Sequence, residues 1–304
     1  MRRISWRRFD WYLLGLVLLL TGFGVLMIAS ALSGNEVLAR WPWRQAGFAA
    51  VGLVLLFLAA AFDYRLLGSV AYGIYGLLLA TLMVLSAVGT VVGGAQRWLS
   101  LGDFLLQPSE LIKIGVILAL AHYLSSHEGR AESLFTPVGA LLILLPAVLL
   151  IYLQPNFSTA LSLLVIGGMM LLLGGMRWRH AIFLLAVAAA AAVPVWQFYL
   201  EDYMKDRVLM FLDPNQAALA DRYNIEQAMI SIGSGGWLGR GLFRGSQSQL
   251  HFLRVRHTDF IFSVTAEELG FVGAALLILL FALLLFRLVR IASISSDTFG
   301  RLTR

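Results

Sequence analysis

The chain has 304 residues, of which 60% are hydrophobic and only 13% are charged. It contains no cysteine, so disulfides and thiolate metal sites are excluded. A net charge of +6 would suggest nucleic-acid binding in a soluble protein. A chain this apolar is instead expected to lie in a membrane, with membrane lipid and no nucleic acid as a partner.

Eight long apolar stretches take up most of the chain. A hydrocarbon core about 30 Å thick needs roughly 20 apolar helical residues, and only helices and closed barrels satisfy their backbone groups in lipid. These Leu-, Ala- and Val-rich stretches lack the alternation of barrel strands, so the sequence predicts an all-α polytopic membrane protein with a single domain, 1–304. The stretches lie at about 11–32, 44–62, 66–92, 105–124, 135–153, 157–175, 180–199 and 260–286.

The distribution of arginine predicts the orientation of these spans. With the N-terminus in the cytoplasm, the inner segments are rich in arginine and the short outer segments are poor in it, as the positive-inside rule requires. The polar segment 200–258, between the last two spans, then lies outside, where any chemistry would face away from the cytosol. The inner segments hold Arg2, Arg3, Arg7, Arg8, Arg65, Arg130, Arg177, Arg179, Arg287, Arg290, Arg301 and Arg304, and the outer ones hold Arg40, Arg44 and Arg97.

The polar segment 200–258 contains two helical patterns. Apolar residues recur at helical spacing in 203–212, with Arg207 on the opposite, polar face. The same spacing recurs in 224–232, where Asn224 followed by Gln227 resembles a capping box. We expect two short amphipathic helices, which either lie at the membrane interface or pack on the bundle.

A glycine-rich segment, 233–245, follows the second of these helices. Its six glycines allow a close backbone approach to an anionic ligand, or they form a flexible loop. The segment is not a P-loop, because the Lys-Ser/Thr pair is absent. His251 and His257 lack the helical spacing of a zinc site, so metal ligation has little support here.

Acidic residues at the start of the last span are candidates for chemistry. Asp259 stands where the polar segment enters the span, beside His257 and Phe260, and apolar surroundings favour proton uptake by a carboxylate. Asp259 is therefore a candidate general base, or else the N-cap of the last helix. Glu267 and Glu268 lie about two turns further in, where a charge either borders a cavity or pairs with a basic residue.

A second set of polar residues lies at other predicted outer turns. Glu110 and Lys113 are three residues apart at the start of a span, which places them on one helical face. They form either a structural ion pair or, with Arg97, a cationic pocket for phosphate. Gln154, at the turn after the fifth span, could supply hydrogen bonds to the same pocket.

An ordered set of motifs spans nearly the whole chain. It consists of Gly-Ala-Gln-Arg-Trp at 94–98, Gln-Pro-Ser-Glu-Leu-Ile-Lys-Ile at 107–114, Gln-Pro-Asn-Phe-Ser-Thr-Ala at 154–160, Phe-Leu-Asp-Pro at 211–214, Ile-Gly-Ser-Gly-Gly at 232–236, Gly-Ser-Gln-Ser-Gln-Leu at 245–250, His-Thr-Asp-Phe-Ile-Phe at 257–262 and Glu-Glu-Leu-Gly at 267–270. This set resembles the shape, elongation, division and sporulation (SEDS) family. The sequence at 211–214 and at 248–250 is more similar to the RodA (elongation) branch than to the FtsW (division) branch.

The resemblance implies a peptidoglycan glycosyltransferase of the bacterial cytoplasmic membrane. Such an enzyme polymerises lipid II onto a lipid-linked nascent glycan at the outer membrane face, in cell-wall elongation, together with a class B penicillin-binding protein. Asp259 matches the family's catalytic aspartate, Glu110 and Lys113 its charged pair, and Arg97 its arginine before tryptophan. Gln154, Arg207, His257 and Glu267 are further candidates for binding substrate. The resemblance assigns no definite cofactor, and a divalent cation, Mg²⁺ or Mn²⁺, would suit a diphosphate leaving group.

The chain also departs from the family pattern. Asn156 stands where relatives usually carry aspartate, and Arg254-Val255 replaces the common Pro-Glu. Family members have ten spans and this sequence has eight, so the last two helices are expected to be lacking. Two alternatives to polymerisation stay open: a lipid II flippase or other transporter, since a span carries Lys113, and a non-catalytic scaffold for the transpeptidase, which an eight-span form would favour.

Overall fold

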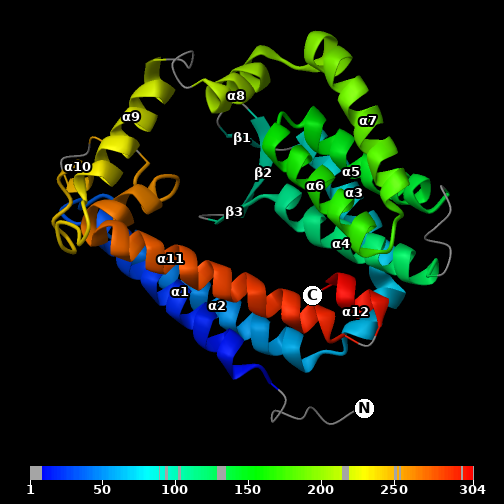
Figure 1. The fold of residues 1–304 in the computed structure, drawn as a ribbon, viewed down its shortest axis with the longest axis horizontal. Coiled ribbons are helices and arrows are strands. Elements are labelled where there is room, and N and C mark those ends of the chain that lie inside the picture. Colours follow the sequence, from blue (N-terminus) through cyan, green and yellow to red (C-terminus); the bar gives the residue numbers. More distant parts are fainter. Residues whose placement is uncertain are drawn as a thin grey trace. The chain divides into compact units, whose positions relative to one another are not determined.

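The computed structural model describes residues 9–88, 90–92, 95–101, 104–128, 135–213, 219–249, 252, 255–295 and 297–303. These residues are mainly helical (Figure 1). They form two compact units, Met1–Phe62 with Glu201–Arg290 and Asp63–Leu200 with Ile291–Arg304. The elements in order are α1 (Trp11–Ala31), α2 (Trp41–Ala61), α3 (Tyr64–Val88), β1 (Thr90–Val92), β2 (Ala95–Leu101), β3 (Phe104–Leu106), α4 (Pro108–Ser126), α5 (Phe135–Leu153), α6 (Phe157–Leu173), α7 (Trp178–Pro194), a π-helix (Val195–Tyr199), α8 (Asp202–Leu212), α9 (Leu219–Ser234), α10 (Ser246–Gln249), α11 (Ile261–Ser293) and α12 (Thr298–Thr303).

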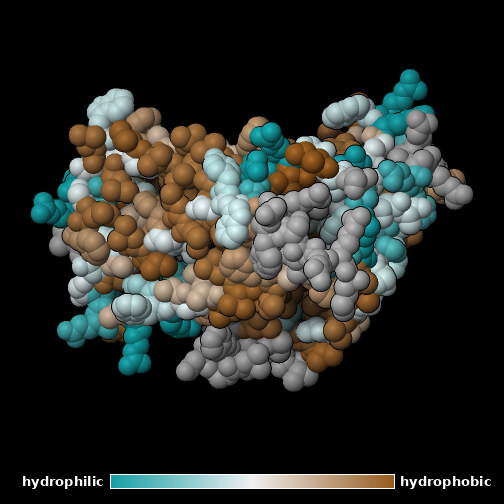
Figure 2. Space-filling view, turned by 90° about the horizontal axis from the view of Figure 1, so that it is seen from below, coloured by the Kyte–Doolittle hydropathy of each residue, from teal (hydrophilic) through white to brown (hydrophobic). Residues whose placement is uncertain are grey.

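The predicted helical membrane fold is confirmed. A helix lies in each of the eight predicted spans, and seven of the described helices are long and apolar enough to cross a bilayer. The eighth, α6, is apolar but has only 17 residues. No residue of α2 or α7 is buried, and Figure 2 shows apolar side chains gathered over much of the visible face. Exposed apolar helices of this kind suit a lipid environment.

A small sheet between α3 and α4 was not predicted. β1, β2 and β3 form an antiparallel sheet in that order, with Thr90 opposite Trp98 and Leu99 opposite Leu106. Strand pairing satisfies the backbone groups of a stretch too short to cross the membrane again. The sheet shortens the predicted spans 66–92 and 105–124 to α3 and α4.

In the first unit, α1 and α11 run antiparallel and are joined near both ends. Asp10 caps α1 by accepting a hydrogen bond from the Leu13 N–H (3.0 Å), and its carboxylate also pairs with the Arg287 guanidinium at 2.6 Å. Near the other end, the Ser30 hydroxyl donates to Glu268 at 2.5 Å. The N-terminal end of α11 therefore lies beside the C-terminal end of α1, and Figure 1 shows the two helices side by side.

Replacing Asp10 with asparagine should lower thermal stability and its dependence on pH. Burial raises the pKa of Asp10, but hydrogen bonds from Arg287 and Leu13 outweigh this effect and hold the pKa below its usual value. A lowered folded-state pKa stabilises the protein above the unfolded pKa of about 3.9, and this contribution is lost as the pH falls through the folded value. We expect a loss of roughly 1 kcal/mol at pH 7 for the variant.

The measurement is thermal unfolding in detergent between pH 7 and pH 3. The exposed carboxylate of Glu36 supplies the control, Glu36→Gln, which should unfold at the wild-type temperature at pH 7. Equal stability of Asp10→Asn and wild type at pH 7 would contradict the assignment of this ion pair.

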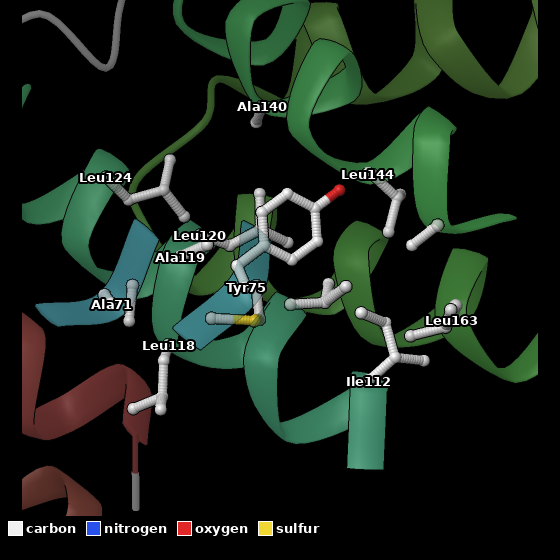
Figure 3. Close-up of a cluster of buried hydrophobic side chains, with 14 of the residues drawn as sticks. Ala71, Tyr75, Ile112, Leu118, Ala119, Leu120, Leu124, Ala140, Leu144 and Leu163 are labelled. Atoms are coloured by element: carbon white, nitrogen blue, oxygen red, sulfur yellow. The ribbon is translucent and has the colours of Figure 1, made fainter. Parts of the chain in front are cut away.

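In the second unit, α4 is the central helix and packs against α3, α5 and α6. Figure 3 shows the Tyr75 ring of α3 among apolar side chains of these helices, including Leu120 and Leu144. Helices in lipid are held by such close packing, because lipid tails are as apolar as the side chains. The buried α4 therefore gives a rigid support to the residues at its N-terminal end. At the opposite end of the unit, Phe299 of α12 contacts Tyr64 and His122.

Candidate active site

Asp259 lies in a tight turn immediately before α11. The Val255 carbonyl accepts hydrogen bonds from the N–H groups of Thr258 (3.1 Å) and Phe260 (3.4 Å), which closes the turn. The Asp259 side chain is exposed and accepts no hydrogen bond from any of the described residues. Phe260 takes the capping position, since its carbonyl accepts the N–H groups of Ser263 and Val264. The geometry thus speaks against Asp259 as the helix cap and leaves its carboxylate open to a ligand.

His257 is packed against the first unit's helices. Its ring meets the Trp41 ring of α2 edge to face, with centroids 4.8 Å apart. Burial and the neighbouring Arg256 charge lower the pKa of His257, and they outweigh the opposing effect of Asp259. The imidazole is therefore neutral at pH 7, so the predicted contact of His257 with substrate would be a hydrogen bond rather than an ion pair.

Glu267 and Glu268 are both fully buried, on α11. Glu267 accepts hydrogen bonds from the Ser231 hydroxyl (3.1 Å), the Ser246 hydroxyl (3.2 Å) and the Gln247 N–H (2.8 Å). Glu268 accepts hydrogen bonds from the Ser30 hydroxyl and from the Phe243 N–H (3.2 Å). The two carboxylates therefore join α11 to different segments of the chain. This geometry favours a positioning role for Glu267, and its predicted contact with substrate stays a prediction.

The helix α11 is broken at Gly270, which has φ 68° and ψ −166°. The break leaves backbone groups on both sides without their usual helical partners. The glycine-rich segment supplies those partners: the N–H groups of Arg240 and Gly241 donate to the carbonyls of Glu267 (3.0 Å) and Glu268 (2.9 Å). In return, the Phe271 N–H donates to the Gly236 carbonyl and the Val272 N–H to the Trp237 carbonyl. The backbone of 233–245 therefore approaches α11 closely, and a contact of this segment with an anionic ligand stays a prediction.

Replacing Gly270 with alanine should destabilise the first unit by at least about 2 kcal/mol. A Cβ at Gly270 would lie 2.3 Å from the Gly239 nitrogen, and the φ angle of Gly270 is positive. Gly73, on α3, has no atom within 4 Å of an added Cβ and provides the control, Gly73→Ala. Thermal unfolding in detergent measures both variants. Unchanged stability of Gly270→Ala would show that the break is not held as described.

The ion pair between Glu110 and Lys113 lies in the first turns of α4. Pro108 begins the helix, and the Lys113 Nζ is 2.8 Å from a Glu110 carboxylate oxygen. The side chains keep 28% exposure for Lys113 and 54% for Glu110, so the pair is open to a ligand. An exposed pair of this kind contributes little to stability, which leaves room for a role in binding.

The other residues predicted in the second unit lie at the same end of it. Gln154, at the end of α5, is buried and donates from Nε2 to the Leu82 carbonyl (2.9 Å) and the Ser86 hydroxyl (3.0 Å) of α3. Asn156 donates to Ser109 of α4 at 3.4 Å. Arg97 lies on β2, which packs against α3 and α4, but its side chain falls outside the described residues. Gln154 thus joins α3 to α5, and a contact with substrate stays a prediction.

Arg207 lies on α8, and its side chain is exposed. The predicted helix at 203–212 is confirmed, since α8 begins only one residue earlier. Within the described part of the chain, no three His, Asp or Glu side chains come close enough together to hold a metal ion. The structure therefore groups Asp259, His257, Arg207 and Glu267 in the first unit, and Glu110, Lys113, Gln154 and the strand of Arg97 in the second.

Comparison with known proteins identifies the family. A family model described as "Cell cycle protein", which covers FtsW, RodA and SpoVE, matches residues 10–303. The chain belongs to this family. It is 39% identical over 287 residues to "Peptidoglycan glycosyltransferase MrdB" of Escherichia coli strain K12, which covers 94% of this chain and 76% of the relative. It is 34% identical over 307 residues to "Probable peptidoglycan glycosyltransferase FtsW" of Geobacter sulfurreducens strain DL-1 / KN400, covering 97% of this chain and 80% of the relative.

Solved structures agree with this assignment. A chain of a complex described as "Structural coordination of polymerization and crosslinking by a peptidoglycan synthase complex" matches with a TM-score of 0.81 and 34% identity, over 98% of this chain and 82% of that one. The Rod shape determining protein RodA of Thermus thermophilus matches with a TM-score of 0.68 and 31% identity, over 98% and 80% of the two chains. The SEDS resemblance is confirmed, and the chain is a multi-pass protein of the bacterial cytoplasmic membrane.

Proposed function

We propose that this chain is a peptidoglycan glycosyltransferase that polymerises lipid II into β-1,4 glycan at the outer face of the cytoplasmic membrane, in cell-wall elongation. Relatives that match over more than nine-tenths of this chain carry that enzymatic name. The observation that carries the mechanism is the Asp259 carboxylate, which is exposed and accepts no hydrogen bond from the described residues. Such a group is free to act as a general base.

The reaction requires one base and one inversion. The donor carries an α-linked diphosphate at its sugar carbon, and the product linkage is β, so a single displacement suffices and no covalent intermediate is needed. Asp259 takes the proton from the acceptor's 4-hydroxyl as its oxygen bonds to the donor carbon. The bond from that carbon to the diphosphate oxygen breaks, and the diphosphate leaves with the electron pair.

The leaving diphosphate gains negative charge and needs cations around it. Lys113 and Arg97 provide them in this proposal, and Glu110 orients Lys113 through the 2.8 Å ion pair. A divalent cation fits only if the diphosphate supplies most of its ligands, because the described residues offer no cluster of protein ligands.

The orientation of the first unit supports an outward-facing site. Asp10 and Arg287 pair at one end of α1, and Ser30 and Glu268 at the other. Since α1 is long enough to cross the membrane once, this proposal places the turn that carries Asp259 on the face opposite to the N-terminal end of α1. The arginine distribution assigns the N-terminus to the cytoplasm, so Asp259 faces outward in this proposal.

A transport function is the second candidate, because discontinuous helices are typical of transporters and α11 is broken at Gly270. In transporters, however, the backbone groups freed by such a break bind the substrate. Here they are occupied by the backbone of 236–241. This arrangement favours the enzyme over the flippase.

Labelled lipid II separates these candidates. The full chain is reconstituted in vesicles with and without a class B penicillin-binding protein from the same organism. Formation of glycan polymer supports the proposed enzyme. Transfer of the labelled headgroup across the vesicle membrane without polymer indicates a flippase, and binding of the penicillin-binding protein alone indicates a scaffold.

A further inference from the structure

The turn that carries Asp259 is fixed to the first unit through its preceding residues. Arg256 is only 5% exposed, and its Nε donates to the Ala31 carbonyl at 2.6 Å. His257, the next residue, packs on Trp41. These contacts place the turn at the corner where α1 ends and α2 begins.

Ala31 is the last residue of α1, which explains why a cation is held there. The final carbonyls of a helix lack intrahelical partners, and the helix dipole makes this end negative. The Arg256 guanidinium satisfies one of these carbonyls and brings a positive charge to the end of the helix. A neutral side chain of similar length would supply a weaker hydrogen bond and no charge.

Burying Arg256 is nevertheless costly. Burial lowers the pKa of its guanidinium, and its Nη2 atom has no hydrogen-bond partner among the described residues. A buried donor without an acceptor costs stability. The single hydrogen bond to Ala31 offsets only part of this cost, and costs of this kind are retained mainly where function requires them.

We propose that Arg256 is a positioning residue that holds Asp259 in the geometry needed for proton transfer, by fastening its turn to the C-terminus of α1. The proposal rests on the proposed function. Arg256 acts through the turn. It lies three positions before the base, its side chain anchors the turn to α1, and it takes no proton itself. A displacement of about 1 Å at a reacting group can cost on the order of 100-fold in rate.

A graded series of substitutions tests this role. We expect Arg256→Lys, which keeps the charge and one donor, to lower kcat about threefold, and Arg256→Gln to lower it about 10- to 100-fold. The KM for lipid II should stay within about twofold of wild type in both, because substrate contacts are unchanged. The matched control is Arg244→Gln, an exposed arginine of the same unit, which should behave as wild type.

Thermal unfolding of each variant separates positioning from folding. A fall in kcat in the order arginine, lysine, glutamine, at constant KM and unfolding temperature, supports the proposal. A wild-type kcat in Arg256→Gln overturns it. A fall in kcat that is accompanied by a lower unfolding temperature or by a changed KM also overturns it. If Arg256→Gln does not fold, Arg256→Lys decides: a lowered kcat at unchanged KM supports the proposal, and wild-type kcat overturns it. Wild-type polymerisation that depends on Asp259 but not on Arg256 would refute this inference alone, whereas an inactive wild type would refute the proposed function.

Discussion

Replacing Asp259 with asparagine should lower the rate of glycan polymerisation by about 100- to 10,000-fold while leaving the protein folded and inserted. Asparagine has nearly the same shape but cannot take the acceptor's proton. Because the Asp259 carboxylate makes no hydrogen bond with the described residues, its loss should not change thermal stability. Labelled lipid II turnover by the purified chain, measured together with a class B penicillin-binding protein from the same organism, gives the effect.

Asp206→Asn provides the matched control for this prediction. Asp206 is an exposed aspartate of the same unit, on α8, and its substitution should leave the rate unchanged. A normal rate of polymerisation by Asp259→Asn would refute the assignment of the base. A loss of activity accompanied by a lower unfolding temperature would show instead that Asp259 has a structural role.

Replacing Lys113 with alanine should lower kcat by about 100- to 1,000-fold, the typical effect of removing one group that stabilises charge developing in a transition state. The expected cost in stability is small, because the pair with Glu110 is solvent-exposed. The rate of lipid II turnover and thermal unfolding, measured on the same preparation, distinguish the two effects.

Exchanging the two charges tests whether the pair is merely structural. The double variant Glu110→Lys with Lys113→Glu can form the same ion pair in reverse on the same face of α4. If Lys113 stabilises the diphosphate, the exchange should leave the enzyme as inactive as Lys113→Ala. Recovery of activity in the double variant would show that only the ion pair matters and would remove Lys113 from the mechanism.

The membrane helices could be predicted from the sequence because their signal is local. A run of about 20 apolar residues has few alternatives in lipid, so a helix lies in each predicted stretch. The amphipathic pattern at 203–212 was equally local and gave α8 to within one residue. The capping box predicted at Asn224 and Gln227 was wrong, because both residues lie inside α9, which the structure describes from Leu219.

The break in α11 could not be predicted from local pattern. Gly270 follows Glu268 by two residues within a long, mostly apolar span, and its positive φ depends on hydrogen bonds with 236–241, about 30 residues earlier. The donors to Glu267 and Glu268 were missed for the same reason: Ser30, Ser231 and Ser246 are distant in sequence. The available signal was indirect, since two adjacent buried carboxylates in an apolar span require polar partners.

Some features of the candidate site could be predicted from the sequence, and others needed the structure. The pairing of Glu110 with Lys113 followed from their spacing, and the structure confirms it. The choice between base and cap for Asp259 needed the structure, because only the hydrogen bonds of Phe260 show which residue caps α11. Arg256 was overlooked, since nothing in the sequence places a surface-type residue against the last carbonyl of a helix more than 200 residues away.

The most direct test of the account is the side of the membrane on which Asp259 lies. The chain has no cysteine, so Thr258→Cys gives a single thiol in the exposed turn next to the base, and Asp63→Cys gives one in the turn between α2 and α3. We predict that a membrane-impermeant maleimide added to intact cells, with the outer membrane permeabilised where one is present, labels residue 258 and not residue 63. Labelling of residue 63 but not residue 258 would place Asp259 in the cytoplasm, where it could not act on lipid II at the outer face.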